Sequence, residues 1–284
     1  MHLAFSAWAM RDLPVERQIQ IVRNAGYVGI CLVSDPRWPH LDALTLSSED
    51  RRRMRRLLDE NELALTAIAG HASVVDSRPD ALTRLRAGID LAVDLAGADG
   101  PPPLVTMAYG TPETYARERD LVADAFGEIA GYAAKRGATV ALEPHVGQAF
   151  DTPEKVVWLM QAVNSAHFRL NLDNSHFEVM GRDLDEYVPM LAPYAVHTDL
   201  KDQRGRAPNH EFLVPGEGDF SYSRYLQALQ AAGYGGYLSV EISVMVQRRR
   251  DYDPAEVAAR SFHVVVDAAR AANVPLEYRD PVAA

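Results

Sequence analysis

Four acidic side chains in the second half of the chain could together hold a divalent metal ion and transfer protons. Each stands at or near the end of a short apolar run, and the four are Glu143, Asp173, Asp199 and Glu241. Carboxylates that lie close together resist joint ionisation, and a bound divalent cation removes that conflict. Oxygen ligands favour Mg²⁺ or Mn²⁺, whereas an added imidazole shifts the preference toward Mn²⁺, Co²⁺ or Zn²⁺. We therefore expect one divalent cation, Mn²⁺ or Mg²⁺ first, with Co²⁺ or Zn²⁺ as alternatives.

The alternative interpretation is that these acids cap helices or form ion pairs, because a single carboxylate after an apolar strand carries little information. Whether these acids form a metal site or only caps and ion pairs depends on the strands and helices that position them. Short apolar runs predict buried strands at 3–8, 27–33, 64–69, 104–108, 139–143, 168–173, 195–200 and 237–242. Amphipathic stretches predict helices at 15–24, 48–61, 80–95, 114–136, 153–164, 184–191, 221–232 and 254–273.

This alternation of strand and helix predicts an α/β protein with a (β/α)₈ TIM barrel, in a single domain over residues 1–284. The active site of such a barrel lies at the C-terminal ends of the strands, where the four acids are expected to meet. A metal chelated by a substrate carbonyl and the adjacent hydroxyl acidifies the intervening C–H and stabilises an enediolate. Glu143 and Glu241 are the expected catalytic residues, because one could abstract a proton while the other, or a water, returns it.

Five short motifs resemble those of the sugar phosphate isomerase/epimerase superfamily, the xylose isomerase-like TIM barrel group. They are Ala-Leu-Glu-Pro-His at 141–145, Asn-Leu-Asp-Asn-Ser-His at 171–176, His-Thr-Asp-Leu-Lys-Asp at 197–202, Pro-Gly-Glu-Gly-Asp-Phe at 215–220 and Gly-Tyr-Leu-Ser-Val-Glu at 236–241. The resemblance covers nearly the whole chain. It implies a divalent metal held by Glu143, Asp173, one residue of the seventh strand and Glu241.

Two positions depart from the pattern of that superfamily. An aspartate, Asp199, stands where the second histidine of the seventh-strand motif is the expected ligand. His197 and Asp199 point to the same side of a strand, so either could reach the metal. We prefer Asp199, which lies nearer the C-terminal rim, and keep His197 as the alternative fourth ligand. Similar ketose 3-epimerases often carry a further glutamate where this chain has Ala149, which weakens an assignment to sugar 3-epimerases.

Several other side chains are expected to contact a substrate from the same rim. For His176, three residues after Asp173, this role is implied by the resemblance. For the others, it is suggested by a position at the end of a strand or in the long segment after strand seven. The complete expected set is Trp8, His71, His145, His176, Lys201, His210 and Glu217. Trp8 could equally pack in the core, Lys201 could pair with Asp202, and the segment from 203 to 210 could be a lid or only the approach to the next helix.

The expected function is a metal-dependent isomerase or epimerase of a small sugar or polyhydroxy carbonyl compound, its small-molecule partner. The closest alternative is a dehydratase (lyase) of the inosose dehydratase type, followed by an endonuclease IV-like phosphodiesterase. A formal net charge of −10 argues against nucleic acid or an anionic membrane as a partner. We expect a cytoplasmic protein, because Cys31 is the lone cysteine and residues 1–5 lack the features of a signal peptide. The resemblance also implies a homo-oligomer.

Overall fold

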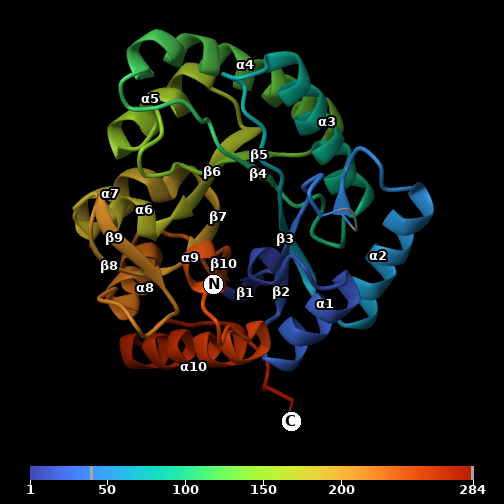
Figure 1. Ribbon diagram of the computed structural model, residues 1–284, viewed down its shortest axis with the longest axis vertical. Coiled ribbons are helices and arrows are strands. Elements are labelled where there is room, and N and C mark those ends of the chain that lie inside the picture. The colour runs from blue at the N-terminus through green and yellow to red at the C-terminus, as the bar shows by residue number, and fades with distance from the viewer. Residues whose placement is uncertain (39–40, 283–284) are drawn as a thin grey trace.

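The computed structural model describes residues 1–38 and 41–282, in which eight parallel strands close into a barrel surrounded by helices (Figure 1). The barrel strands are β1 His2–Ser6, β2 Gly29–Val33, β3 Ala64–Ala69, β4 Leu104–Thr106, β5 Val140–Leu142, β6 Phe168–Asp173, β7 Ala195–Leu200 and β10 Tyr237–Val240. They pair in chain order, and β10 closes the ring against β1. The predicted (β/α)₈ TIM barrel is confirmed.

The outer helices lie where the apolar periodicity predicts them, with ends that differ by at most two residues. They are α1 Val15–Asn24, α2 Ser48–Glu60, α3 Arg78–Asp94, α4 Tyr115–Arg136, α5 Pro153–Val163, α7 Leu184–Leu191, α8 Tyr222–Ala231 and α10 Pro254–Ala272. Local chemistry fixes their ends. The hydroxyl of Thr152 accepts from the N–H of Lys155 at the start of α5, and Gly137 ends α4 with a φ of 64°, a left-handed conformation that glycine adopts readily.

The first strand is shorter than predicted. The apolar run from Leu3 to Trp8 suggests one strand, but β1 ends at Ser6 and the 3₁₀ helix η1, Ala7–Met10, follows it. The hydroxyl of Ser6 accepts from the N–H of Trp8 at 3.3 Å, which turns the backbone out of the sheet. Trp8 therefore lies just beyond the strand, on the rim of the barrel.

The long segment after β7 forms a hairpin that the sequence does not predict. Strands β8, Asp202–Arg206, and β9, Asn209–Leu213, pair antiparallel, with Asp202 opposite Leu213. The hairpin packs against two short helices that also follow barrel strands, α6 Asn174–Val179 and α9 Val244–Gln247 (Figure 1). These additions lie at the C-terminal ends of the strands. Among the described residues, no helix is both long and apolar enough to cross a membrane.

Candidate active site

The four acids lie at the C-terminal ends of strands β5, β6, β7 and β10. Glu143 and Glu241 directly follow their strands, Asp173 ends β6, and Asp199 is the last residue but one of β7. All four are buried, with exposed fractions of 4% for Glu143, 0% for Asp173, 5% for Asp199 and 9% for Glu241. One oxygen from each of Glu143, Asp173 and Glu241 lies within 4.8 Å of the other two. That spacing suits three ligands of one cation, and acids that only capped helices would not converge in this way.

The two oxygens of Asp173 have different partners. Oδ1 accepts from the backbone N–H of Ser175 at 2.8 Å and from its hydroxyl at 2.7 Å, so that Asp173 also caps helix α6. Oδ2 accepts from Nζ of Lys201 at 2.7 Å. The same ammonium group lies 3.3 Å from Oε1 of Glu241. Lys201 therefore contacts two of the three converging carboxylates.

A chain of buried hydrogen bonds orients the seventh-strand residues. Nδ1 of His197 lies 2.9 Å from Oδ1 of Asn171, and Nε2 lies 3.2 Å from the hydroxyl of Thr66. Both ring nitrogens of His197 are thus engaged. The amide of Asn171 donates to Oδ2 of Asp199 at 2.6 Å, whereas Oδ1 of Asp199 is buried and has no hydrogen-bond partner in the described part of the chain. Buried polar atoms are normally paired, so this oxygen has capacity for a ligand.

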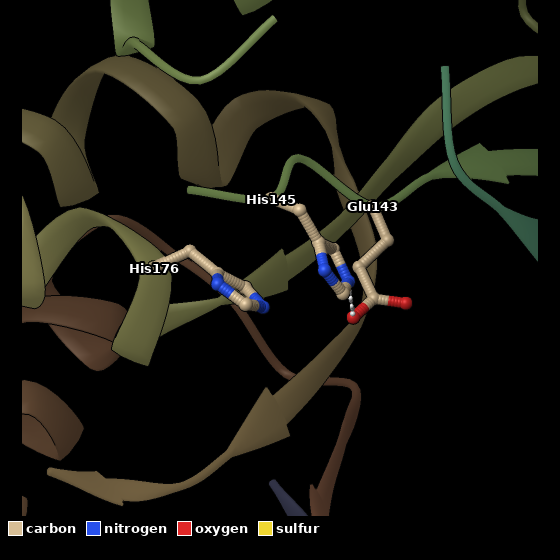
Figure 2. A group of neighbouring side chains, drawn as sticks. All are labelled: Glu143, His145 and His176. Atoms are coloured by element: carbon tan, nitrogen blue, oxygen red, sulfur yellow. Dashed lines mark hydrogen bonds and ion pairs between the residues drawn. The ribbon is translucent and has the colours of Figure 1, made fainter. Parts of the chain in front are cut away.

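Two histidines stand beside Glu143. Nε2 of His145 lies 2.8 Å from Oε1 of Glu143, and the rings of His145 and His176 stack with centroids 3.9 Å apart (Figure 2). Both ring nitrogens of His176 are buried without a hydrogen-bond partner among the described residues, although Nε2 lies 3.4 Å from Oδ2 of Asp173. Burial, followed by the nearby His145, lowers the pKa of His176 well below its ordinary value. His176 is therefore a neutral imidazole near neutral pH, able to accept or donate one hydrogen bond to a bound molecule.

The environment separates the proton affinities of the two glutamates. Burial opposes ionisation of Glu143, but His145 and Lys201 outweigh it and hold the pKa of Glu143 well below its ordinary value. Burial raises the pKa of Glu241 to about 7, with the charge of Glu143 adding to the effect and Lys201 opposing it. Burial and the neighbouring glutamates also raise the pKa of Asp199 well above its ordinary value. A pair of carboxyl groups with separated pKa values is suited to act as base and acid.

A stability measurement tests the raised pKa of Glu241. A carboxyl whose pKa rises from 4.5 to about 7 on folding contributes stability below pH 4.5 and loses it as the pH rises through 7. Glu241→Gln removes that loss, and we expect the metal-free variant to be more stable than the unmodified protein at pH 8 by on the order of 3 kcal/mol. At pH 5 the difference should largely vanish.

The measurement is thermal unfolding in excess chelator at both pH values. Glu60→Gln, at an exposed position at the end of α2, is the matched control and should change stability at neither pH. A Glu241→Gln variant that is less stable than the unmodified protein at pH 8 would contradict the proposed charge balance.

Of the other expected substrate contacts, His71 and His210 lie near this cluster. The ring of Trp8 lies 6.0 Å from that of His71, which follows β3. His210, on β9, packs edge-on against Phe212 at 5.0 Å, and Phe212 in turn lies 5.3 Å from His176. The hairpin thus covers one side of the cluster through Phe212, a residue that sequence reasoning did not select.

Glu217, also an expected substrate contact, pairs with arginines instead of the clustered acids. Its carboxylate forms ion pairs with Arg249 at 2.8 Å and with Arg260 at 3.0 Å. The structure therefore does not bring Glu217 into the carboxylate cluster. Lys201 pairs with Asp173 and Glu241 rather than with Asp202.

Asp202 instead organises the loop that contains the Pro-Gly-Glu-Gly-Asp-Phe motif. Its carboxylate accepts from the backbone N–H groups of Gly216 at 2.8 Å, Gly218 at 3.0 Å and Phe220 at 3.2 Å. A Cβ at Gly218 would lie 2.2 Å from Oδ1 of Asp202, so the close approach requires glycine. Neither this role of Asp202 nor that of Thr66 has a local sequence signal. Asn171 has one, because it lies two residues before Asp173 and so on the same side of β6.

Comparisons with known proteins agree with this architecture. The model of the xylose isomerase-like TIM barrel family matches residues 19–265. An inosose dehydratase of Geobacillus thermodenitrificans is 27% identical over 143 residues, which cover 44% of this chain and 47% of that protein. The match thus spans about half the length of this curated relative.

Two solved structures illustrate the similarity in fold. The IOLI protein with a binding zinc atom superposes with a TM-score of 0.75 at 17% identity, over 96% of this chain and 98% of that chain. A D-psicose 3-epimerase in the presence of D-fructose gives a TM-score of 0.75 at 14% identity, over 96% and 99%. At such identities the likeness concerns the fold.

Proposed function

Because the chain belongs to the xylose isomerase-like TIM barrel family, we propose that it is a divalent-metal-dependent isomerase or epimerase of a small sugar or polyhydroxy carbonyl compound. The observation that carries this proposal is the convergence of three buried carboxylates, Glu143, Asp173 and Glu241, at the C-terminal end of the barrel. Ala149, where similar ketose 3-epimerases often have a glutamate, is the reason that the proposal is not narrowed to that reaction.

The donor atoms suit a hard divalent cation. Glu143, Asp173 and Glu241 would each supply one oxygen, and Asp199 would supply Oδ1, the buried oxygen that lacks a partner. His197 is the weaker candidate for the fourth ligand, because both its ring nitrogens already have partners. Four carboxylate ligands favour Mn²⁺ or Mg²⁺ over Zn²⁺. When bound, the cation would polarise the substrate carbonyl and acidify the adjacent C–H.

The two glutamates would transfer the proton. Glu143, whose Oε1 lies 2.8 Å from Nε2 of His145, would take the proton from the substrate carbon. Glu241, which directly follows β10, would deliver a proton to the neighbouring carbon or to the other face of the same carbon. Delivery to the neighbouring carbon gives an isomer, and delivery to the opposite face gives an epimer. His176 and His145 would orient the substrate hydroxyl groups.

The runner-up is a dehydratase. The inosose dehydratase similarity supports it, although the match spans about half of that relative. The same first step would remove a proton, and a neighbouring hydroxyl would then leave as water with the proton donated by Glu241. An endonuclease IV-like phosphodiesterase has less support, because the net charge of −10 opposes DNA binding.

Solvent deuterium distinguishes these reactions. We expect the Mn²⁺-loaded protein, incubated in D₂O with a panel of ketoses, aldoses and inososes, to introduce deuterium at carbon in at least one compound. An isomerase or epimerase gives a product of unchanged composition apart from the label, whereas a dehydratase gives one that has lost water. Mass spectrometry and proton NMR separate the two. Cleavage of abasic DNA without any carbon exchange would contradict the proposal and favour the phosphodiesterase.

A further inference from the structure

Lys201 occupies the oxygen of Asp173 that a cation would need. Oδ1 of Asp173 is committed to the N–H and hydroxyl of Ser175 at the start of α6, at 2.8 Å and 2.7 Å. Only Oδ2 is left to face the cluster, and Nζ of Lys201 lies 2.7 Å from it. A cation bound by Asp173 through Oδ2 therefore meets the ammonium group at the same atom.

The same conflict exists at Glu241. Nζ of Lys201 lies 3.3 Å from Oε1 of that residue, so one ammonium group contacts two of the three converging carboxylates. The side chain of Lys201 is 5% exposed, which leaves little water to screen its charge. An ammonium group and a divalent cation that share buried oxygens repel each other strongly.

The backbone of Lys201 is fixed by Asn174, whereas its side chain has four rotatable bonds. The Lys201 N–H donates to Oδ1 of Asn174, and the Lys201 carbonyl accepts from Nδ2 of Asn174, both at 3.1 Å. Nζ lies 5.7 Å from the ring centre of Phe212, on the hairpin that covers the cluster. The aromatic face offers a neighbouring position for the ammonium group without withdrawal of the strand.

We propose that Lys201 is the internal counter-ion of the metal-free chain and that a divalent cation displaces its ammonium group from Asp173 and Glu241 in order to bind. The proposal rests on the proposed metal site. Lys201 is a positioning residue in this account. It stabilises the carboxylate cluster before the cation arrives, and it lowers the affinity of the site for the cation.

The first test compares Mn²⁺ affinities. After removal of metal, free Mn²⁺ is titrated by electron paramagnetic resonance against the unmodified protein, Lys201→Met and Lys155→Met. Lys155 forms a 2.8 Å ion pair with Asp151 at the start of α5, so it controls for the loss of a lysine–aspartate pair elsewhere. We expect Lys201→Met to bind Mn²⁺ about tenfold more tightly or better, because it removes a buried competing charge, and Lys155→Met to be unchanged.

The second test separates displacement from simple charge repulsion. In protein labelled with ¹⁵N-lysine, the Lys201 ammonium resonance is assigned by its absence from Lys201→Gln, and diamagnetic Mg²⁺ is then added. Displacement from two carboxylates should shift or broaden this resonance, while that of Lys155 stays in place. An unmoved Lys201 resonance at saturating Mg²⁺ would overturn the proposal.

A third test measures thermal stability, and it applies if Lys201→Met folds poorly without metal. We expect its melting temperature in chelator to fall below that of the unmodified protein, and saturating Mn²⁺ to reduce or reverse the deficit. If the unmodified protein binds Mn²⁺ and both Lys201→Met and Lys201→Gln bind it no more tightly, the counter-ion proposal is wrong while the metal site stands. If none of the three binds Mn²⁺, the proposed metal-dependent function itself fails.

Discussion

Replacing Glu143 with glutamine is expected to lower kcat by about a thousandfold at saturating Mn²⁺. Glutamine has nearly the same shape and keeps an oxygen for His145, which lies 2.8 Å from Oε1 in the unmodified protein. It cannot accept a proton from carbon, so the step proposed for the ionised carboxylate is lost. The low pKa of Glu143 keeps its carboxylate ionised at neutral pH, so that it is free to accept a proton.

The rate to measure is the exchange of substrate carbon-bound hydrogen with D₂O, using the compound that the panel identifies. The Mn²⁺ content of Glu143→Gln is measured in parallel, so that loss of the cation is not mistaken for loss of the base. Glu60→Gln, at its exposed position on α2, should retain full activity. Near-normal turnover by a metal-loaded Glu143→Gln variant would refute the assignment of Glu143 as the base.

The second largest effect is expected for Asp173→Asn, which should weaken Mn²⁺ binding by a hundredfold or more. Asparagine can still accept the hydrogen bonds from Ser175 that begin α6, so the helix cap is preserved. The charged oxygen that faces the cluster becomes a neutral amide atom, and the buried ammonium group of Lys201 loses its closest partner. Removing one partner of a buried ion pair costs about 3 to 5 kcal/mol, so the metal-free variant should also be less stable.

Asp183→Asn provides the matched control for this change. Asp183 caps α7 through the N–H of Asp185 at 3.0 Å, so the chemistry of the substitution is the same, but the position is exposed. We expect it to leave Mn²⁺ affinity unchanged, as measured by the same titration. Equal affinities for Asp173→Asn and the unmodified protein would exclude Asp173 as a ligand.

The barrel could be predicted because its determinants are local. Each strand is an apolar run bounded by polar residues, and each helix carries its own periodicity and caps, such as Thr152 before α5. The convergence of the carboxylates at the strand ends followed from the parallel barrel itself. The predicted range of the first strand is too long at its end, because the apolar residues continue to Trp8. Only the turn at Ser6 marks the end of β1.

The remaining features depend on contacts between distant residues. The hairpin β8–β9 has exposed polar residues on most of β8 and no alternating apolar face there, so its sequence lacks a strand pattern. It packs against α6 and α9, which lie far from it in the sequence. The engagement of His197 likewise depends on Thr66, which lies 131 positions earlier in the chain. The position of Lys201 between two carboxylates appears only when β6, β7 and β10 are placed side by side.

We propose that the buried carboxylates at the end of the barrel hold one divalent cation. The most direct measurement is the number of Mn²⁺ ions that the unmodified, chelator-treated protein binds at pH 7.5, determined by equilibrium titration and confirmed by elemental analysis. We expect saturable binding of one ion per chain, which Asp173→Asn weakens by a hundredfold or more and Asp183→Asn leaves unchanged. Absence of saturable Mn²⁺, Mg²⁺, Co²⁺ and Zn²⁺ binding by the folded protein would contradict this proposal.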